Sequence, residues 1–216
     1  MPAAVSSRQP GAKLRFSGAE AQWLLAEERR WLAEAMAVRP ARPWLWLVPG
    51  PCTGADEALL PGRRGMLLHE CEGGYAGALR CGLPLPLAND CLGDVVLQHP
   101  ASDDAWALLE ECTRVLVDGG RLWLFLVNPW SPFRLRRPRD LPAPAHGPWL
   151  QRLRALGLQA DPPQFIGPRW RLAGTGGTRA SRLPLRAACV IVAEKRGLAP
   201  VAPAPLAWRR GAAPAA

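Results

Sequence analysis

A strand–helix–strand pattern in the middle of the chain constrains its fold more than any other feature. The apolar run 94–98 predicts a strand, and Ser102 is placed to cap a following helix. Apolar residues recur at helical spacing over 106–116, and Gly119-Gly120 would end that helix. The run 122–127 is apolar throughout, which is typical of a strand buried on both faces. This βαβ order predicts an α/β domain with a parallel sheet.

Further elements are expected on both sides of this unit. Residues 17–37 predict a helix that opens with a capping box at Ser17 and carries the charged run 27–30 between its apolar positions. Short apolar runs predict strands at 44–48, 66–69 and 187–194. All of these elements fit one α/β domain.

The chain has 216 residues, which suits a single domain. We expect that domain to cover residues 14–197, between a disordered N-terminus at 1–13 and a disordered Pro/Ala-rich tail at 198–216. The N-terminus lacks the apolar region of a secretory signal, and no apolar run reaches the ~20 residues of a membrane-spanning helix. The six cysteines form no CxxC pair, so reduced thiols are favoured over a metal site. These observations predict a cytoplasmic protein without a metal.

Charge is distributed unevenly along the chain. Residues 1–128 carry 12 basic and 15 acidic side chains, whereas residues 129–216 carry 15 basic and 3 acidic ones. The first part therefore has a net charge of −3 and the second a net charge of +12, which together give the +9 of the whole chain. Such a region attracts phosphates or anionic headgroups, so an anionic partner is expected there.

Residues 85–131 carry motifs that can be compared with a known family. The motifs are Leu85-Pro86-Leu87, Leu92-Gly93-Asp94, Arg114-Val115-Leu116, Gly119-Gly120 and Asn128-Pro129-Trp130-Ser131. In this order they resemble the class I S-adenosylmethionine (SAM) dependent methyltransferases of type 11, in a proteobacterial branch with NPWS after the fifth strand. The resemblance implies a Rossmann-like class I methyltransferase fold, with a mostly parallel central sheet flanked by helices and an antiparallel late strand. It also implies SAM as the cofactor, over the carboxyl ends of strands one, two and four.

By this resemblance, Gly50 and Gly54 take the place of the family's glycine-rich turn after the first strand. Glycines belong there because the backbone must approach the cofactor closely. The turn departs from the family pattern, since Trp46 stands near its acidic position and Pro49 and Pro51 remove backbone donors. These departures predict weakened cofactor binding, or a plain turn without a cofactor.

The resemblance assigns the rest of the cofactor site to positions after the second strand. Glu70 would accept hydrogen bonds from the ribose hydroxyls. Cys81 stands where the family often has an aspartate facing the adenine amino group, and a thiol accepts that bond poorly. Gly82 and Leu83 would line the adenine slot, and Gln98, at the end of the fourth strand, would face the methyl group. A polar strand end at Glu70 and a packed structural thiol at Cys81 are the alternative interpretations.

On the acceptor side, the substrate is unknown. His99 and Asn128 are the catalytic candidates, because they follow strands four and five at the same sheet edge and His can exchange protons near neutral pH. Trp130 would wall a substrate pocket. The arginines that would bind an anionic group are Arg134, Arg136 and Arg137. Capping, loop packing and a solvated basic face are the corresponding structural alternatives.

Two functions are consistent with these residues. The first is a SAM-dependent methyltransferase of unknown substrate. The second is a catalytically inactive relative that keeps the fold and uses its basic C-terminal half to contact RNA, an anionic membrane or an acidic protein.

Overall fold

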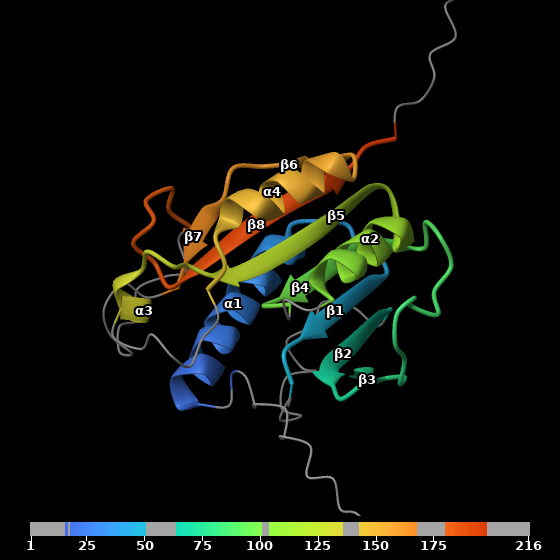
Figure 1. Ribbon diagram of the computed structural model, residues 1–216. Helices are drawn as coiled ribbons and strands as arrows, with labels where there is room; N and C mark the ends of the chain where they lie inside the picture. The colour runs from blue at the N-terminus through green and yellow to red at the C-terminus, as the bar shows by residue number, and fades with distance from the viewer. Residues whose placement is uncertain are drawn as a thin grey trace, which may run out of the picture.

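The computed structural model of the chain describes residues 16, 18–50, 64–100, 104–135, 143–167 and 180–197. Its centre is an eight-stranded mixed sheet with helices on both faces (Figure 1). The strands are β1 (Trp44–Val48), β2 (Gly65–Cys71), β3 (Gly74–Gly77), β4 (Leu92–Gln98), β5 (Leu116–Val127), β6 (Leu158–Ala160), β7 (Gln164–Ile166) and β8 (Ala188–Lys195). The helices are α1 (Ala19–Ala37), α2 (Ala105–Val115), α3 (Pro132–Leu135) and α4 (His146–Ala155). The strand order is β3-β2-β1-β4-β5-β8-β6, with β7 paired to β8.

The middle of the sheet is the parallel part that the sequence predicted. β1 pairs in parallel with β2 and with β4, and β4 pairs in parallel with β5. Every residue of β1 and β4 is buried, which explains why β1 is apolar throughout and why β4 shows no polar alternation, although it carries the buried Asp94 and Gln98. β8 runs antiparallel to β5, with Phe125 opposite Val190. The predicted fold class, including the antiparallel late strand, is confirmed.

Helices cover the two faces of the sheet with separate apolar layers. α1 packs on the face that carries Trp46, Trp123 and Phe125. Trp31 of α1 meets the last two rings edge-on, with centroids 6.1 Å apart in each pair. α2 and α4 cover the opposite face (Figure 1), toward which alternate strand residues such as Leu47 point.

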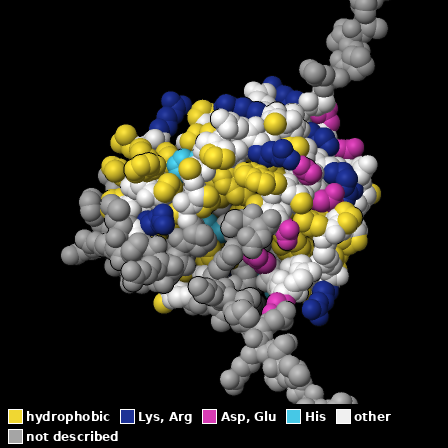
Figure 2. Space-filling view, in the orientation of Figure 1, with side chains coloured by type: hydrophobic (Ala, Val, Ile, Leu, Met, Phe, Trp, Pro, Cys, Tyr) yellow, Lys and Arg dark blue, Asp and Glu magenta, His cyan; other side chains and the backbone are white. Residues whose placement is uncertain are grey.

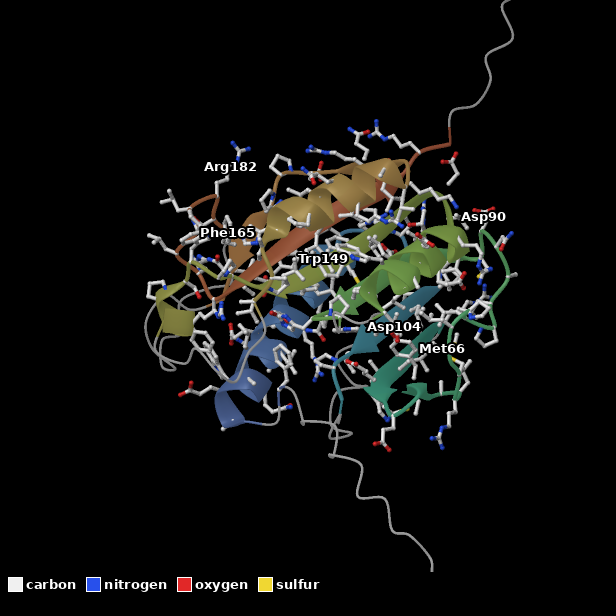
Figure 3. All side chains as sticks on the ribbon, in the orientation of Figure 1. Met66, Asp90, Asp104, Trp149, Phe165 and Arg182 are labelled. Atoms are coloured by element: carbon white, nitrogen blue, oxygen red, sulfur yellow. The ribbon has the colours of Figure 1, made fainter. Side chains whose placement is uncertain are left out.

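An aromatic pair joins α2 to α4. The rings of Trp106 in α2 and Trp149 in α4 have centroids 4.7 Å apart, and Trp149 is buried whereas Trp106 is 41% exposed. Figure 2 shows apolar side chains gathered over this junction, and Figure 3 labels Trp149 between the two helices. The pair therefore packs the two helices against each other as well as against the sheet.

α1 differs from its prediction at its start and on its charged face. It begins at Ala19 with Gly18 as the N-cap and without a side-chain capping bond, while Ser17 lies outside the described residues. Glu28 and Arg29, expected among solvent-facing charges, are 0% and 4% exposed. Both are buried because polar and aromatic groups of the sheet lie beneath them; the Arg29 guanidinium, for example, lies 6.0 Å from the centroid of an indole ring of β1.

The glycine pair after α2 serves the sheet rather than the helix. α2 ends before the pair is reached, and Gly119-Gly120 lie inside β5. The register of β4 against β5 shifts between Leu92 and Asp94, which marks a bulge, and Gly119 has the positive φ of +70° found in such irregularities. The N-cap of α2 is Asp104, without a side-chain capping bond, and Ser102 lies outside the described residues. The predicted helix stop at the glycines was therefore wrong.

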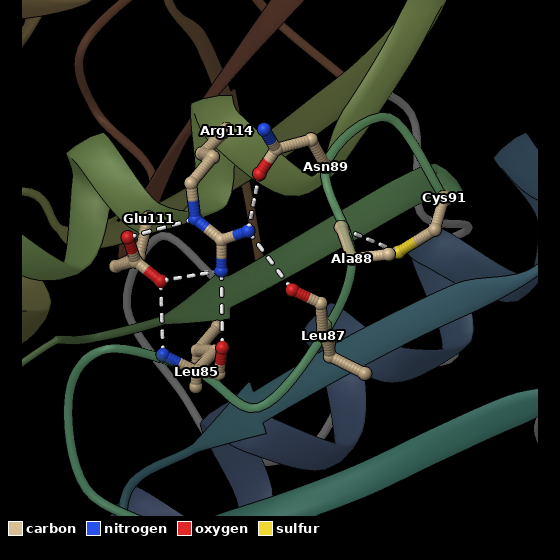
Figure 4. Close-up of polar contacts among 7 residues, drawn as sticks. All are labelled: Leu85, Leu87, Ala88, Asn89, Cys91, Glu111 and Arg114. Carbon is tan, nitrogen blue, oxygen red and sulfur yellow. Dashed lines mark hydrogen bonds and ion pairs between the residues drawn. The ribbon is translucent and has the colours of Figure 1, made fainter.

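The loop before β4 is held by an arginine of α2 (Figure 4). The Arg114 guanidinium donates to both carboxylate oxygens of Glu111 and to the backbone oxygens of Leu85 and Leu87 at 3.0 and 2.9 Å. It also donates to the Asn89 side-chain oxygen at 2.6 Å, and Glu111 in turn accepts from the Leu85 backbone N–H. These bonds explain two of the sequence motifs together, because the arginine of the motif at 114–116 holds the backbone of the motif at 85–87.

An unpredicted strand, β3, closes the sheet edge beside β2. The two strands form an antiparallel hairpin through a tight turn that includes Gly73, whose φ is +77°. The segment between the parallel strands β2 and β4 is described throughout and contains no helix, although such a connection usually has one; it begins instead with the hairpin strand β3. The hairpin therefore places Tyr75 directly opposite Glu70 at the end of β2.

Candidate functional site

A shallow depression opens at the carboxyl ends of β1, β2 and β4. Its described walls include Pro49, Glu70, Tyr75, Leu97, Gln98 and Leu108. Between these walls there is room for about one water molecule, far less than the ~300–1,000 Å³ of usual small-molecule pockets. The segments 51–63 and 101–103, which follow β1 and β4 in the chain, lie outside the described residues. The described walls therefore lie at the edge of the sheet where the sequence predicted the cofactor.

Glu70 and Tyr75 supply the polar side of the depression. They face each other across the β2–β3 pair, and both line the depression. Burial raises the pKa of the Tyr75 phenol above its ordinary value, and the negative charge of Glu70 raises it further. The phenol is therefore neutral at physiological pH and able to donate a hydrogen bond beside a carboxylate that accepts them.

Gly50 stands where the first turn passes the end of β2. A Cβ atom at this position would lie 2.1 Å from the Glu70 backbone oxygen, so only glycine permits the observed contact. The turn therefore approaches β2 closely, as a cofactor turn does, although here the contact is made with the protein's own backbone. The second predicted glycine, Gly54, lies outside the described residues.

The polar residues at the end of β4 belong to a buried network under α1. Gln98 accepts a hydrogen bond from the Trp46 indole N–H at 3.0 Å and donates to a Glu28 carboxylate oxygen at 2.9 Å. His99 Nε2 lies 2.9 and 3.0 Å from the two Glu28 oxygens. Because a carboxylate only accepts, the imidazole holds a proton on Nε2. One buried glutamate thus binds both side chains that the sequence predicted at the methyl-transfer position.

His99 has two further structural features. Its backbone φ of 45° is unusual for a residue with a side chain, and its ring stacks on Phe16 with centroids 4.4 Å apart. The second ring nitrogen, Nδ1, is buried without a hydrogen-bond partner among the described residues. His99 is therefore held between Glu28 of α1 and the ring of Phe16, and it is only 5% exposed.

The residues predicted around the adenine lie in the loop after the β2–β3 hairpin. Cys81 exchanges two backbone hydrogen bonds with Tyr75, of 2.7 and 2.9 Å. Burial raises the pKa of its thiol, which keeps it protonated. Gly82 is exposed and Leu83 packs at the edge of the core. None of the three predicted residues, Cys81, Gly82 and Leu83, lines the described depression; their hydrogen-bonded neighbour Tyr75, which the sequence did not predict, does.

Asn128 ties two loops together beyond the end of β5. Its side-chain amide donates to the backbone oxygens of Pro184 and Arg186 at 2.9 and 2.8 Å, and its oxygen accepts from the Trp130 N–H at 3.1 Å. Asn128 is buried, whereas Trp130 is 74% exposed. Arg134 is half-buried in α3, while Arg136 and Arg137 lie outside the described residues.

Sequence reasoning missed two residues that shape this edge, Glu28 and Tyr75. Glu28 stands in a run of charged residues typical of an exposed helix face, so its burial leaves no local signal. The hairpin that positions Tyr75 has a signal in the Gly73-Gly74 pair after an apolar run.

The described residues contain no group of three His, Cys, Asp or Glu side chains placed to hold a metal ion. Nor do they include a helix long and apolar enough to span a membrane.

Neither a protein-family profile nor a curated protein matches this chain. Among solved structures, a SAM dependent methyltransferase from Archaeoglobus fulgidus aligns with a TM-score of 0.55 at 16% identity, over 83% of this chain and 96% of that one. A SAM-dependent methyltransferase from Thermotoga maritima, described as a possible histamine N-methyltransferase, aligns with a TM-score of 0.52 at 14% identity, over 82% and 95% of the two chains. These likenesses show that the chain has the class I methyltransferase fold.

Proposed function

We propose that this chain is a SAM-dependent methyltransferase that holds its cofactor at the depression above β1, β2 and β4. The observation that carries the proposal is the position of Glu70. It ends the second parallel strand and lines the depression, with its carboxylate beside a neutral phenol. A carboxylate at this place can accept two hydrogen bonds from a ribose.

The described residues fit the nucleoside part of SAM in some respects and not in others. Glu70 would hold the ribose hydroxyls, and Tyr75, Leu97 and Leu108 would form an apolar wall for the adenine. The adenine amino group gains no carboxylate from Cys81, which agrees with the weakened binding predicted from the sequence. When bound, SAM supplies an activated methyl group for transfer to a nucleophile.

His99 and Asn128 have positioning roles in this proposal. Each side chain already forms hydrogen bonds that hold the loop after β4 or β5. Holding these loops still positions an acceptor, which is the main requirement of methyl transfer. The substrate, the type 11 grouping, the single domain over residues 14–197 and the cytoplasmic location stay predictions of the sequence.

The test is calorimetric titration of the full-length, cofactor-stripped chain with SAM and with its demethylated product. We expect micromolar binding, and Glu70→Gln should weaken it ~10- to 100-fold, because hydrogen bonds to charged groups contribute about 1.5–3 kcal/mol each. Glu72→Gln is the matched control, since Glu72 is exposed two residues further along the hairpin. Absence of binding at millimolar ligand would refute the proposal.

A second candidate function is a methyltransferase fold that binds a partner without catalysis. The burial of both Gln98 and His99 against Glu28 favours it, because the polar groups that these side chains would offer a substrate are already bonded to protein atoms. Binding of SAM without turnover over a wide panel of acceptors would support this function, and methylation of any acceptor would exclude it.

A further inference from the structure

We propose that the loops around Asn128 form a docking surface for an anionic lipid membrane. The surface, called the Trp130 edge, consists of four exposed side chains: Trp130, Arg182, Leu183 and Leu185. The inference does not depend on SAM binding, because it rests on a different part of the chain.

Large apolar side chains of the Trp130 edge are exposed to solvent. Trp130 is 74% exposed, Leu183 59% and Leu185 42%. In the described part of the chain only two other large apolar side chains, Val38 and Trp106, have comparable exposure, and both lie on other elements. A contiguous exposed apolar patch on a loop edge marks an interaction site more often than an isolated apolar side chain does.

A buried amide holds the two loops as one surface. Asn128, with 0% exposure, donates to the backbone oxygens of Pro184 and Arg186 on one loop and accepts from the Trp130 N–H on the other. Ser131 stabilises the turn that starts at Asn128, because its hydroxyl donates to the Asn128 backbone oxygen at 2.9 Å. The apolar side chains are therefore presented by hydrogen-bonded backbone, which reduces the entropy lost on docking.

The positive charge around the Trp130 edge favours an anionic partner. The described segments 128–135 and 180–186 contain three arginines and no acidic residue. Arg182 is exposed and projects outward from the molecule in Figure 3, on the side where apolar side chains gather in Figure 2. Tryptophan and leucine side chains that enter the headgroup region, with arginines that meet phosphates, are the pattern of proteins that dock on anionic bilayers.

The exposed leucines favour a lipid surface over a nucleic acid. Binding to single-stranded nucleic acid uses aromatic rings that stack on bases, and the edge offers one ring, Trp130. Leu183 and Leu185 gain nothing against a sugar-phosphate backbone, whereas the acyl boundary of a bilayer removes them from water. Because the edge follows β5 directly, a docked membrane would lie beside the carboxyl end of the sheet, where the depression opens.

The test is flotation of the full-length chain with vesicles of phosphatidylglycerol and phosphatidylethanolamine, and with vesicles of phosphatidylcholine alone. We expect binding to the anionic vesicles, with at least tenfold weaker binding to phosphatidylcholine and a steep loss at high salt. Trp130→Ala should weaken binding about tenfold, and Arg182→Gln about fivefold, as one basic residue near an anionic surface does.

Two control variants remove the same groups elsewhere. Val38→Ser removes an apolar side chain that is 87% exposed at the end of α1, and Arg154→Gln removes an exposed charge on α4. Neither should change vesicle binding. Thermal unfolding of all four variants checks that they fold, which their exposed positions favour.

Three results would overturn the proposal. They are equal binding to both vesicle types, equal loss in the control variants, and a folded wild-type chain that stays unbound at low salt. Tighter binding of single-stranded RNA or of an acidic protein, lost in Trp130→Ala, would assign the edge to that partner instead.

Discussion

The carboxyl ends of β2 and β4 both carry polar side chains, but the protein surrounds them in opposite ways. At β4, Gln98 and His99 are buried under α1 and bonded to Glu28. At β2, Glu70 lies at a depression opposite Tyr75. Only one neighbouring strand separates the two ends. The difference indicates that Gln98 and His99 stabilise the fold through Glu28, while Glu70 lies where the cofactor is proposed to bind.

Glu28→Ala is the strongest test of this division. Removing the carboxylate leaves the Gln98 amide and the His99 Nε2–H without their buried acceptor, so we expect a loss of about 3 kcal/mol or more in the free energy of unfolding. Chemical denaturation measures it. Glu27→Ala is the control, because Glu27 pairs with Arg30, whose side chain is 59% exposed, and such a pair should contribute less than ~1 kcal/mol. Equal effects of the two variants would contradict a stabilising network, and Glu28→Gln gives an intermediate value if Glu28→Ala does not fold.

Trp46→Phe should have a smaller effect on the same network. The variant removes the indole N–H that bonds the Gln98 oxygen and leaves that oxygen buried, which costs about 1–2 kcal/mol. Trp31→Phe is the control. It is half-buried in α1, and no hydrogen bond of its indole N–H occurs within the described residues. Denaturant midpoints compare the two; a larger loss in Trp31→Phe would show that ring packing, and not the hydrogen bond, determines stability here.

The smallest expected effect concerns the β2 end and uses the fact that Tyr75 is the only tyrosine in the chain. Burial and Glu70 raise its pKa above the ordinary 10.0, so the phenol ionises less readily in the folded state. Its contribution to stability is complete below pH 10 and is lost as the pH rises through the folded pKa. Absorbance of the tyrosinate during alkaline titration measures this pKa directly.

Glu70→Gln should lower the pKa of Tyr75 toward its ordinary value, because the variant removes the negative charge across the strand pair. Glu72→Gln, on the exposed turn, should leave the pKa closer to that of the wild type. An unchanged titration in Glu70→Gln would contradict the electrostatic contact between Glu70 and Tyr75 and weaken the case for a ligand site at this end.

Local sequence patterns predicted the elements of the sheet better than its edges. The apolar runs of β1, β4 and β5 identified a buried parallel core, because strands buried on both faces have no polar alternation. The same reasoning misassigned Gly119-Gly120, since a glycine pair permits positive φ equally at a helix end and in a strand bulge. The short strand β3 was missed because four residues with two glycines carry little periodicity.

The candidate site was predicted as a set of positions and not as an arrangement. Counting from strand ends placed Glu70, Gln98 and His99 at one edge of the sheet, and all three lie there. Their surroundings were not predictable, because Glu28 meets Gln98 from 70 residues away along the chain.

The sequence by itself determined the parallel core, the existence of the late strand β8 and the excess of positive charge in the C-terminal half, since these depend on side-chain type and spacing along the chain; the antiparallel direction of β8 came only from the family resemblance. The tertiary structure alone decided which polar strand end is covered and which is open. That choice depends on where α1 packs across the sheet and on how the β2–β3 hairpin turns back. Both are tertiary contacts, and the local sequence of either partner does not specify them.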